Sequence, residues 1–510
     1  MSIDWDKAAS HYFSIPGLRP FQHQVVTHLE TGQDVVVLAP TGGGKSLCFQ
    51  LPAVVQQQQT AIVISPLRSL IEDQVDDLVR QNISAVAFYG EQPENVQQHI
   101  LDGMTDNPPR YRLIYTTPEM TEHWEFRQHL NFMANRQRLS YWIIDEAHCV
   151  SVWGHDFRDS FLGLGFCKIE YPDIPLIALT ATATPEVIVD IKRILSLDTT
   201  ETRVIRQSFN RNNLSLSTRQ RTNDISDLLQ QVKRLTTAFQ TTPQHPSSGI
   251  IYCTTRKQCD SLAKLLQQCG ISCVSYHAGI SSSDRVRFQQ SWKNNQVQIV
   301  VATIAFGMGI NKPDVRFVIH YHLPKNLEGY YQEIGRAGRD GNLSYCLLYY
   351  HLEDFHLIRE MIEKSAKSER LTKIEIQKLN RMLYFAQQHQ QCLHQYLCQY
   401  LGEPVEPCRD RCQNCRTTTT TPPSPLQPSQ PQLESSTLPE LFYQILARVK
   451  DQRLTRDQFP EEYQQWITYA ILNRYLKEQP NPHVKSSNTL TLYLYKKGLE
   501  KLIQNQKLLN

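Results

Sequence analysis

The sequence predicts an α/β protein with two consecutive doubly wound parallel sheets, followed by a helical segment and a small C-terminal domain. Short runs rich in Val and Ile alternate with helical or polar segments up to about residue 350, and a second such series begins after about residue 208. Beyond it the pattern becomes helical. We therefore expect α/β domains at 1–207 and 208–350, a helical segment at 351–416, a linker at 417–435 and a winged-helix-like domain at 436–510.

Length and charge limit the possible functions. The 510 residues are enough for about three or four domains. A formal net charge of +3 is nearly neutral, so nucleic-acid binding would need local basic patches. No apolar run approaches membrane-spanning length, and we expect no membrane partner. The odd number of 13 cysteines predicts reduced thiols in the cytosol, with any close cluster reserved for metal.

The expected strands of both α/β domains are short, rich in β-branched or aromatic residues, and flanked by polar segments. Continuous apolar runs of this kind are typical of parallel strands covered by helices on both faces. In the first domain they are residues 34–38, 60–64, 111–115, 141–144 and 176–179. In the second domain they are residues 249–253, 271–275, 298–302, 315–319 and 345–349.

The C-terminal part divides into a low-complexity stretch and an ordered domain. Residues 417–435 begin with threonines and continue with prolines, which predicts a disordered or polyproline-like linker. Beyond it, 438–449 and 461–477 have amphipathic helical patterns, 489–495 alternates with period two, and 497–506 is again helical. Helices, a strand pair and a final helix are typical of a winged helix.

A glycine-rich stretch after the first expected strand predicts a phosphate-binding loop. Residues 38–46 read Leu-Ala-Pro-Thr-Gly-Gly-Gly-Lys-Ser and lead into a helix that begins at Leu47. The glycines allow backbone N–H groups to point at phosphate oxygens, and the helix N-terminus favours the same anion. Lys45 would reach the β- and γ-phosphates of ATP, and Ser46 would bind Mg²⁺. Ala39 departs from the strict motif at its first position, a difference that we do not count against the site. A glycine-rich turn without a ligand is the alternative. The predicted nucleotide contacts here are Thr41, Gly42, Gly43, Gly44, Lys45 and Ser46.

Two acidic residues supply the predicted hydrolytic chemistry. Asp145 and Glu146 come directly after the apolar run 142–144, which we expect to form a strand beside that of the phosphate loop. Asp145 would hold Mg²⁺ through water, and Glu146 would orient and deprotonate the attacking water. Adjacent acids are common on protein surfaces, so this inference depends on the phosphate loop that precedes them.

The stretch 332–340 supplies the second half of the site. Arg336 and Arg339 are three residues apart, which predicts that they share one helical face. Two such cations can stabilise the charge that develops on a transferring phosphoryl group. Since they belong to the second α/β domain, hydrolysis would depend on closure of the two domains. A solvated basic face is the alternative.

Together these motifs resemble superfamily 2 helicases and, in detail, the RecQ family of DNA helicases. The resemblance extends from about residue 10 to residue 415. It implies two RecA-like domains, 3′→5′ unwinding of DNA driven by ATP hydrolysis, and a role in recombination and repair. Further matching stretches are residues 18–22, 65–70, 117–119, 178–183, 276–279 and 302–309.

The resemblance implies roles for individual residues. Gln22, with Arg19 close to it, would recognise the adenine. Thr180 and Thr182 lie in the motif that couples hydrolysis to domain movement. The residues in motifs that touch the DNA backbone are Ser65, Thr117, His277 and Thr303.

Residues 148–158 resemble the aromatic-rich loop of RecQ enzymes and distinguish this chain from RNA-directed DEAH proteins. Trp153 and Phe157 can stack on unpaired bases, at about 1–3 kcal/mol per base. Arg158 can pair with phosphate, and His155 is counted with these DNA contacts. The alternative is that both aromatic residues belong to the core.

A cysteine cluster predicts a zinc site. Cys408, Cys412 and Cys415 provide three thiols at C-x₃-C-x₂-C spacing, and tetrahedral Zn²⁺ needs a fourth ligand. Cys392 and Cys398 both lie upstream, in a segment with a helical pattern. They are six residues apart and therefore cannot share one helical face. The spacing leaves the choice between them open, and thiols without metal are the alternative.

The RecQ resemblance selects Cys392, because these proteins place a ligand cysteine ten residues before a Gly-Glu pair like Gly402-Glu403. A zinc ion bound in this way would hold residues 351–416 together, since this segment is too small for a large core of its own.

The sequence thus predicts an ATP-dependent DNA helicase that uses ATP, Mg²⁺ and Zn²⁺ and acts on single-stranded and duplex DNA. A single-strand-binding protein is a further candidate partner, and we expect a monomer. The expected location is the nucleoid-associated cytoplasm in a bacterium or the nucleus in a eukaryote. One alternative is a DEAH-type RNA helicase, which the Trp153 loop and the cysteines disfavour. Another is a nucleotide-gated strand-annealing or scaffold protein, which suits the lack of an aromatic between Lys477 and Thr489 in the expected wing.

Overall fold

A computed structural model of the chain describes residues 3–154, 156–197, 200–222, 224–239, 247–307, 312–365, 368–417, 476–480 and 490–494. Residues 1–422 and 423–510 form two separate compact units. Within the described ranges, no helix has the length and apolar character needed to cross a bilayer. The expected linker at 417–435 and the expected helices at 438–449 and 497–506 lie outside the described residues, except for Thr417, which ends a helix.

The first α/β domain contains a seven-stranded sheet in the order β3-β4-β2-β5-β6-β1-β7, with every neighbouring pair parallel. This confirms the predicted parallel sheet. Its strands are β1 (Val35–Leu38), β2 (Thr60–Ile64), β3 (Ala85–Phe88), β4 (Leu113–Thr116), β5 (Leu139–Ile144), β6 (Leu176–Thr180) and β7 (Arg203–Arg206). Its α-helices are α1 (Trp5–Phe13), α2 (Pro20–Glu30), α3 (Leu47–Val55), α4 (Arg68–Arg80), α5 (Glu94–Thr105), α6 (Trp124–Asn135), α7 (Phe166–Ile169) and α8 (Pro185–Ile194), and three 3₁₀ helices are η1 (Glu119–Glu122), η2 (Ala147–Val150) and η3 (Asp159–Gly165).

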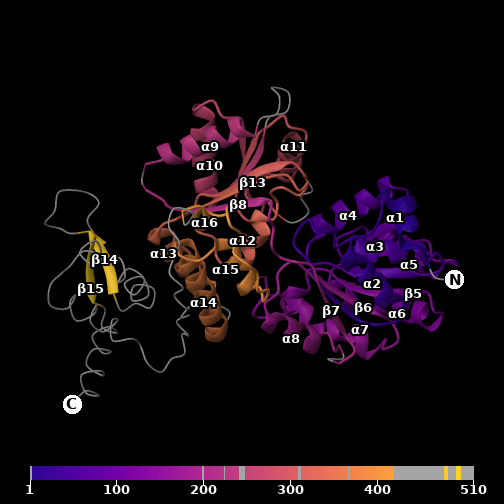
Figure 1. The fold of residues 1–510 in the computed structure, drawn as a ribbon. Helices are drawn as coiled ribbons and strands as arrows, with labels where there is room; N and C mark the ends of the chain where they lie inside the picture. The colour runs from indigo at the N-terminus through magenta and orange to yellow at the C-terminus, as the bar shows by residue number, and fades with distance from the viewer. Residues whose placement is uncertain are drawn as a thin grey trace, which may run out of the picture. The chain divides into compact units, whose positions relative to one another are not determined.

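Strand β1 shows why the apolar runs are continuous. Val36 and Leu38 belong to the core layer shared with α5, α6 and α8, whereas Val35 and Val37 belong to the layer shared with α2, α3 and α4 (Figure 1). Successive side chains point to opposite faces of a strand, and here both faces are covered. Every residue of β1 is therefore buried, and its carboxyl end is a fixed point for the loop that follows.

The prediction that the strand before Asp145 and Glu146 lies next to the strand before the phosphate loop is wrong. We expected β5 beside β1, but β6 lies between them. After the acidic residues the chain returns to the sheet as the fully buried strand β6, which fills the position between β5 and β1. The carboxyl ends of all three strands still meet at one edge of the sheet. Thr180, at the end of β6, is paired with Leu38 and thus lies between the phosphate loop and the carboxylates.

The second α/β domain contains a six-stranded sheet in the order β10-β11-β9-β12-β13-β8, again parallel throughout. Its strands are β8 (Leu214–Gln220), β9 (Ser248–Tyr252), β10 (Cys273–Tyr276), β11 (Ile299–Ala302), β12 (Val315–His320) and β13 (Ser344–Tyr350). Its helices are α9 (Ser226–Ala238), α10 (Arg256–Gln268), α11 (Ser282–Lys293) and α12 (Leu327–Ile334).

The segment that follows is helical, as predicted. Its helices are α13 (Leu352–Lys364), α14 (Glu369–Ala386), α15 (Leu393–Tyr400) and α16 (Gln413–Thr417). Helix α14 packs against α12, where the rings of Tyr330 and Phe385 lie 5.5 Å apart. Helix α16 packs against the edge strand β8 (Figure 1). The helical segment is therefore attached to the second α/β domain through both α12 and β8.

In the second unit, the described residues form one antiparallel pair, β14 (Leu476–Pro480) and β15 (Leu490–Leu494). Strand β15 confirms the strand expected at 489–495. The expected end of the helix 461–477 is wrong, because Leu476 and Lys477 belong to β14 and pair with Leu494 and Tyr493. Pairing with β15 satisfies the backbone groups at these positions instead of a last helical turn.

Candidate functional site

The phosphate loop connects the end of β1 to the start of α3. Gly42 and Gly44 have φ values of +77° and +87°, a left-handed conformation that glycine adopts without strain. A Cβ on Gly44 would also lie 2.8 Å from Nε2 of Gln22. The two positions therefore favour glycine for conformation, and a side chain at the second would also displace the Gln22 amide.

Two residues at the start of α2 hold this loop. The Gln22 side-chain amide donates to the carbonyl oxygen of Gly44 at 2.8 Å, and the Arg19 guanidinium donates to that of Gly43 at 2.8 Å. The backbone N–H of Arg19 donates to Oε1 of Gln22, also at 2.8 Å. Both side chains thus lie beside the phosphate loop, and their contact with an adenine stays a prediction.

Lys45 and the acidic pair form one electrostatic group. The Lys45 ammonium donates to the carbonyl oxygens of Ala39 at 3.0 Å and Pro40 at 3.3 Å. Burial lowers the pKa of Lys45, and the charges of Glu146 and Asp145 oppose this shift. Burial raises the pKa of Asp145, against the charge of Lys45. Opposite charges from β1 and β5 are thus concentrated at one edge of the sheet.

Glu146 has the environment expected of a general base. Its backbone is left-handed, with φ of 51°, and its N–H donates to Oδ1 of Asp145 at 3.0 Å. Burial, and then the neighbouring charge of Asp145, raise the pKa of Glu146 to about 7. A carboxylate with a pKa near neutrality is well suited to accept a proton from water.

The expected helical placement of the two arginines is wrong. Helix α12 ends at Ile334, and Arg336 and Arg339 lie in the turn that follows, which we call the arginine turn (residues 335–340). Gly338 in this turn has φ of +57°, and a Cβ there would lie 2.5 Å from Nδ2 of Asn213. The left-handed glycine and this close contact prevent the helix from continuing.

The arginine turn lies against the phosphate loop of the first domain. A Cβ on Gly42 would be 3.0 Å from Cγ of Arg339. A Cβ on Gly335 would be 3.2 Å from Cβ of Thr41. The structure therefore brings the predicted phosphate-binding and arginine motifs into contact across two α/β domains.

Arg211, just before β8, joins these motifs and was not predicted. Its guanidinium donates to the carbonyl oxygen of Thr41 at 3.3 Å, and to those of Ala337 at 3.0 Å and Gly338 at 2.9 Å. It thus links the phosphate loop to the arginine turn through backbone atoms alone. Any long donor could make such contacts, so no motif pointed to this residue.

Three arginines concentrate positive charge at this junction. Burial, and then the charges of Arg336 and Arg211, lower the pKa of Arg339 to about 10. Arg336 is only 7% exposed and donates to the carbonyl oxygen of Gly307. Because the cations repel one another, an anion bound among them would be strongly favoured.

A chain of contacts connects Glu146 to the second domain. Nδ1 of His148 lies 3.3 Å from Oε2 of Glu146 and 2.9 Å from Oγ1 of Thr180. The Thr180 hydroxyl donates to the carbonyl oxygen of Thr182 at 3.1 Å, and the Gln332 amide donates to Oγ1 of Thr182 at 3.5 Å. The expected coupling residues Thr180 and Thr182 thus lie between Glu146 and the second domain. His148 and Gln332 belong to the stretches 148–158 and 332–340, but neither was predicted to be a site residue.

The predicted backbone contacts share one position. Ser65, Thr117, His277 and Thr303 each directly follow the last residue of a strand, namely β2, β4, β10 and β11. In each sheet the two strands concerned are neighbours. Ligands of α/β domains bind outside the carboxyl ends of the strands. His277 is oriented there by Asp260, whose Oδ1 lies 3.0 Å from its Nε2.

The aromatic side chains of the predicted DNA-binding loop are half-buried. Trp153 packs at the margin of the first domain's core, and Phe157 is likewise between buried and exposed. Neither is a fully buried core residue. His155 lies outside the described residues.

Arg158 has partners within the protein. Its guanidinium pairs with Asp156 at 2.9 Å and donates to the carbonyl oxygen of Pro66 at 2.6 Å. These contacts tie the aromatic loop to the stretch 65–70, which also contains a predicted DNA contact. A phosphate at Arg158 would compete with Asp156.

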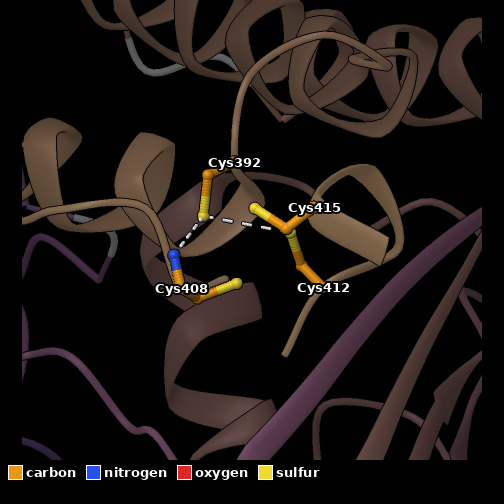
Figure 2. A group of neighbouring side chains, drawn as sticks. All are labelled: Cys392, Cys408, Cys412 and Cys415. Carbon is orange, nitrogen blue, oxygen red and sulfur yellow. Dashed lines mark hydrogen bonds between the residues drawn. The ribbon is translucent and has the colours of Figure 1, made fainter. Parts of the chain in front are cut away.

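Four cysteines come together in the helical segment: Cys392, Cys408, Cys412 and Cys415, shown in Figure 2. Their sulfur atoms all lie within 4.8 Å of one another. The sulfurs of Cys412 and Cys392 are 3.9 Å apart, close to the roughly 3.8 Å between ligands of a tetrahedral zinc–thiolate site. Hydrogen bonds from Cys408 and then Cys412 lower the pKa of Cys392, which favours the thiolate that binds metal. This donor set fits Zn²⁺.

Packing on β8 positions the cluster. The backbone of Cys412 forms an isolated parallel β-bridge with Leu216. The Asn414 side-chain amide donates to the carbonyl oxygens of Gln388 and Gln391 at 2.9 and 2.7 Å. Cys398 lies elsewhere: it is buried on α15 against the first domain's core, and burial raises its pKa to about 12. Geometry thus groups Cys392, and not Cys398, with the other three thiols.

Known protein families match this architecture in order. The DEAD/DEAH box helicase model matches residues 19–191, the helicase conserved C-terminal domain matches 227–341, and the RecQ zinc-binding model matches 352–416. This order defines a class: a helicase core of two α/β domains followed by a zinc-binding segment.

Among the relatives, ATP-dependent helicase SGS1 of Saccharomyces cerevisiae is 42% identical over 414 residues, which cover 79% of this chain and 28% of that protein. RecQ-like DNA helicase BLM of Xenopus laevis is 40% identical over 397 residues, covering 77% of this chain and 28% of that protein. The chain belongs to the RecQ family of superfamily 2 helicases. It spans less than a third of the length of these two relatives.

Solved structures show the same fold. The DUF1998 helicase MrfA bound to DNA is similar with a TM-score of 0.56 and 16% identity, covering 80% of this chain and 60% of that one. The DEAD-box helicase Mss116 bound to single-stranded RNA gives a TM-score of 0.54 and 18% identity, covering 75% of this chain and 84% of that one. At this identity the likeness concerns the fold alone, two tandem parallel-sheet domains.

Proposed function

We propose that this chain is an ATP-dependent DNA helicase that translocates 3′→5′ on single-stranded DNA and unwinds duplexes in recombination and repair. The observation that carries the proposal is the contact between the phosphate loop of the first domain and the arginine turn of the second. A nucleotide bound there would touch both domains, so its hydrolysis would change how they are held together. Such a change is what a motor needs in order to step along a strand.

At the ATP site, each group has a chemistry that matches hydrolysis. The phosphate loop and Lys45 would hold the phosphates, with Gln22 and Arg19 at the adenine. Ser46 and Asp145 offer the oxygen ligands that Mg²⁺ prefers, and the bound ion would neutralise phosphate charge. Glu146 would take a proton from the attacking water. The groups proposed to stabilise the transferring phosphoryl are Arg336 and Arg339.

For nucleic acid, we propose a track over the carboxyl ends of both sheets. The residues proposed to touch its backbone are Ser65, Thr117, His277 and Thr303. Trp153 and Phe157 would stack on bases, with His155 and Arg158 beside them. DNA is favoured over RNA because residues 148–158 resemble the aromatic-rich loop of RecQ DNA helicases and the RecQ zinc-binding model covers the cysteine cluster.

The remaining modules have proposed supporting roles. The four-cysteine cluster would bind one Zn²⁺ and stabilise the helical segment under a duplex. The pair β14–β15 supports a winged-helix-like domain at 436–510. Because one chain supplies both halves of the ATP site, we propose a monomer as the active unit. A single-strand-binding protein is proposed as a partner, and the nucleus of a eukaryote or the nucleoid of a bacterium as the location.

Stimulation of ATP hydrolysis tests this proposal. The rate is measured with Mg²⁺ and without nucleic acid, and then with saturating single-stranded DNA or RNA of one sequence. A DNA helicase gives strong stimulation by DNA and weak stimulation by RNA. Equal or stronger stimulation by RNA would favour the DEAH-type alternative. Stimulation without strand separation would favour an annealing or scaffold protein.

A further inference from the structure

A buried lysine connects the aromatic loop to the helix that leads into the arginine turn. Lys378 lies on α14 of the helical segment, and its side chain is only 6% exposed. Its ammonium donates to the carbonyl oxygen of Trp153 at 2.6 Å and to that of Gly154 at 2.6 Å. The same nitrogen lies 3.5 Å from Oε1 of Glu328 on α12. One cation thus touches the first domain, the second domain and the helical segment.

The loop is held at a point where its backbone has little freedom. A Cβ on Gly154 would lie 2.2 Å from the carbonyl oxygen of His148, so residue 154 packs directly on the segment that follows the acidic pair. The Ser151 hydroxyl accepts from the N–H of Trp153 at 3.1 Å and donates to Asp190 at 2.6 Å. The loop is tightly packed, so its residues would shift together. A base that stacks on Trp153 and displaces the loop would therefore also displace the two carbonyl oxygens that the Lys378 ammonium contacts.

On the other side, Glu328 is buried at the start of α12. It is 3% exposed, and its Oε1 also accepts from the hydroxyl of Tyr400 on α15 at 2.9 Å. Helix α12 spans only eight residues, from Leu327 to Ile334. A shift at Glu328 is therefore transmitted by a short rigid element to the arginine turn, which begins at the next residue.

We propose that Lys378 is a positioning residue that couples DNA on the aromatic loop to the placement of Arg336 and Arg339. The proposal rests on the helicase function above and adds a second route to the ATP site, separate from the contacts of His148. Its physical basis is the charge. A buried ammonium must keep its acceptors, so a movement of the loop carbonyls changes its distance from Glu328.

The experiment compares ATP hydrolysis by four forms of the full chain: wild type, Lys378→Met, Lys378→Met with Glu328→Gln, and Lys373→Met. Methionine is unbranched and keeps most of the length of the lysine side chain without its charge. Lys373 lies on the same helix, is 71% exposed and pairs only with nearby Glu369 among the described residues, which makes it the matched control. Basal rate, plateau rate with single-stranded DNA, the DNA concentration for half-maximal stimulation, and the melting temperature are measured for each.

We expect Lys378→Met to lower the DNA-stimulated plateau about 5- to 150-fold, the usual range of coupling between two sites. The basal rate and the half-saturating DNA concentration should change much less, because no nucleotide or base contact is removed. The single variant leaves Glu328 buried without its cation and should melt at a lower temperature. The double variant removes this unpaired charge, so its melting temperature should recover while its plateau stays low. Lys373→Met should behave as wild type.

Two outcomes would overturn the coupling role. Lys378→Met could retain the full plateau, or the plateau could recover in the double variant together with the melting temperature, which would make the ion pair structural only. If the wild type itself shows no stimulation by DNA, the helicase function fails, and the coupling role fails with it.

Discussion

Glu146 is the residue on which the proposed hydrolysis depends most. Replacing it by Gln keeps the size of the side chain but removes the proton acceptor, while the contacts of Lys45 stay in place. We predict that Glu146→Gln lowers ATP turnover by about 10²- to 10⁴-fold, the usual contribution of a general base. Steady-state hydrolysis with saturating DNA measures this.

Nucleotide affinity provides the control for this prediction. Glu146→Gln should bind a fluorescent ATP analogue nearly as the wild type does, whereas Lys45→Ala should bind it weakly, because a phosphate ligand is lost. Normal DNA-stimulated turnover by Glu146→Gln would show that another group is the base.

Individual site residues could be predicted from the sequence where the chemistry of the site requires a particular residue type at a particular spacing. Lys45, Asp145 and Glu146 are of this kind, and the structure gathers them at one edge of the first sheet. Arg211 and Lys378 could not be found in this way. Both act on backbone carbonyl oxygens, which any long donor can reach, so the sequence around them carries no pattern.

The aromatic loop makes the clearest prediction at the scale of an element. Trp153→Ala should weaken DNA binding by about 1–3 kcal/mol through the lost stack. It should also lower the ratio of stimulated to basal hydrolysis even at saturating DNA. Its melting temperature should fall less than for a fully buried tryptophan, whose truncation costs about 3–5 kcal/mol.

The matched control is Trp124→Ala, since Trp124 is 62% exposed on α6 of the same domain. It should leave the hydrolysis ratio and the melting temperature close to those of the wild type. A large loss of stability in Trp153→Ala, with basal and stimulated rates falling in parallel, would assign Trp153 to the core.

The cysteine cluster makes a second prediction at this scale. Purified protein should contain one equivalent of Zn²⁺ per chain by elemental analysis. Cys392→Ser should lose the metal and fold poorly, as should changes at Cys408, Cys412 or Cys415, because structural zinc supplies folding energy. Cys398→Ala should keep the metal. Zinc retained in Cys392→Ser but lost in Cys398→Ala would mean that the geometric grouping is not the ligand set.

Strands could be predicted from the sequence where both of their faces are buried and apolar. All ten expected strands of the α/β domains correspond to observed strands, because most are continuous apolar runs; β2 has the expected ends, and the other nine are shifted at one or both ends. Strand β8 was missed because it is not a continuous apolar run: Leu alternates with Ser, and its serines are buried only in the folded chain, where α16 also packs against the strand. Strand β7 was missed because it is a four-residue edge strand with arginine at both ends. The arginine turn was predicted to be helical because the spacing of its arginines fits a helix. The left-handed backbone of Gly338 and its contact with Asn213, which appear only in the folded chain, do not fit one.

For the whole molecule, the order of strands was the part that the sequence could not supply. Alternating strands and helices predict parallel sheets, but not that β6 separates β5 from β1. That insertion places Thr180 between phosphate loop and acidic pair, where it contacts His148. The contact of the two α/β domains at the arginine turn likewise depends on the folded chain. Through this contact, an ATP bound as proposed would touch both domains.

Strand displacement is the direct test of ATP-driven DNA unwinding by this chain. Duplexes with a 3′ or a 5′ single-stranded tail are prepared in DNA and in RNA, and release of the labelled strand is followed with ATP and Mg²⁺. We predict rapid release from the 3′-tailed DNA duplex, none without ATP, and little from the 5′-tailed or RNA duplexes. DNA-stimulated ATP hydrolysis without release from any DNA duplex, or release from the RNA duplexes alone, would contradict the account.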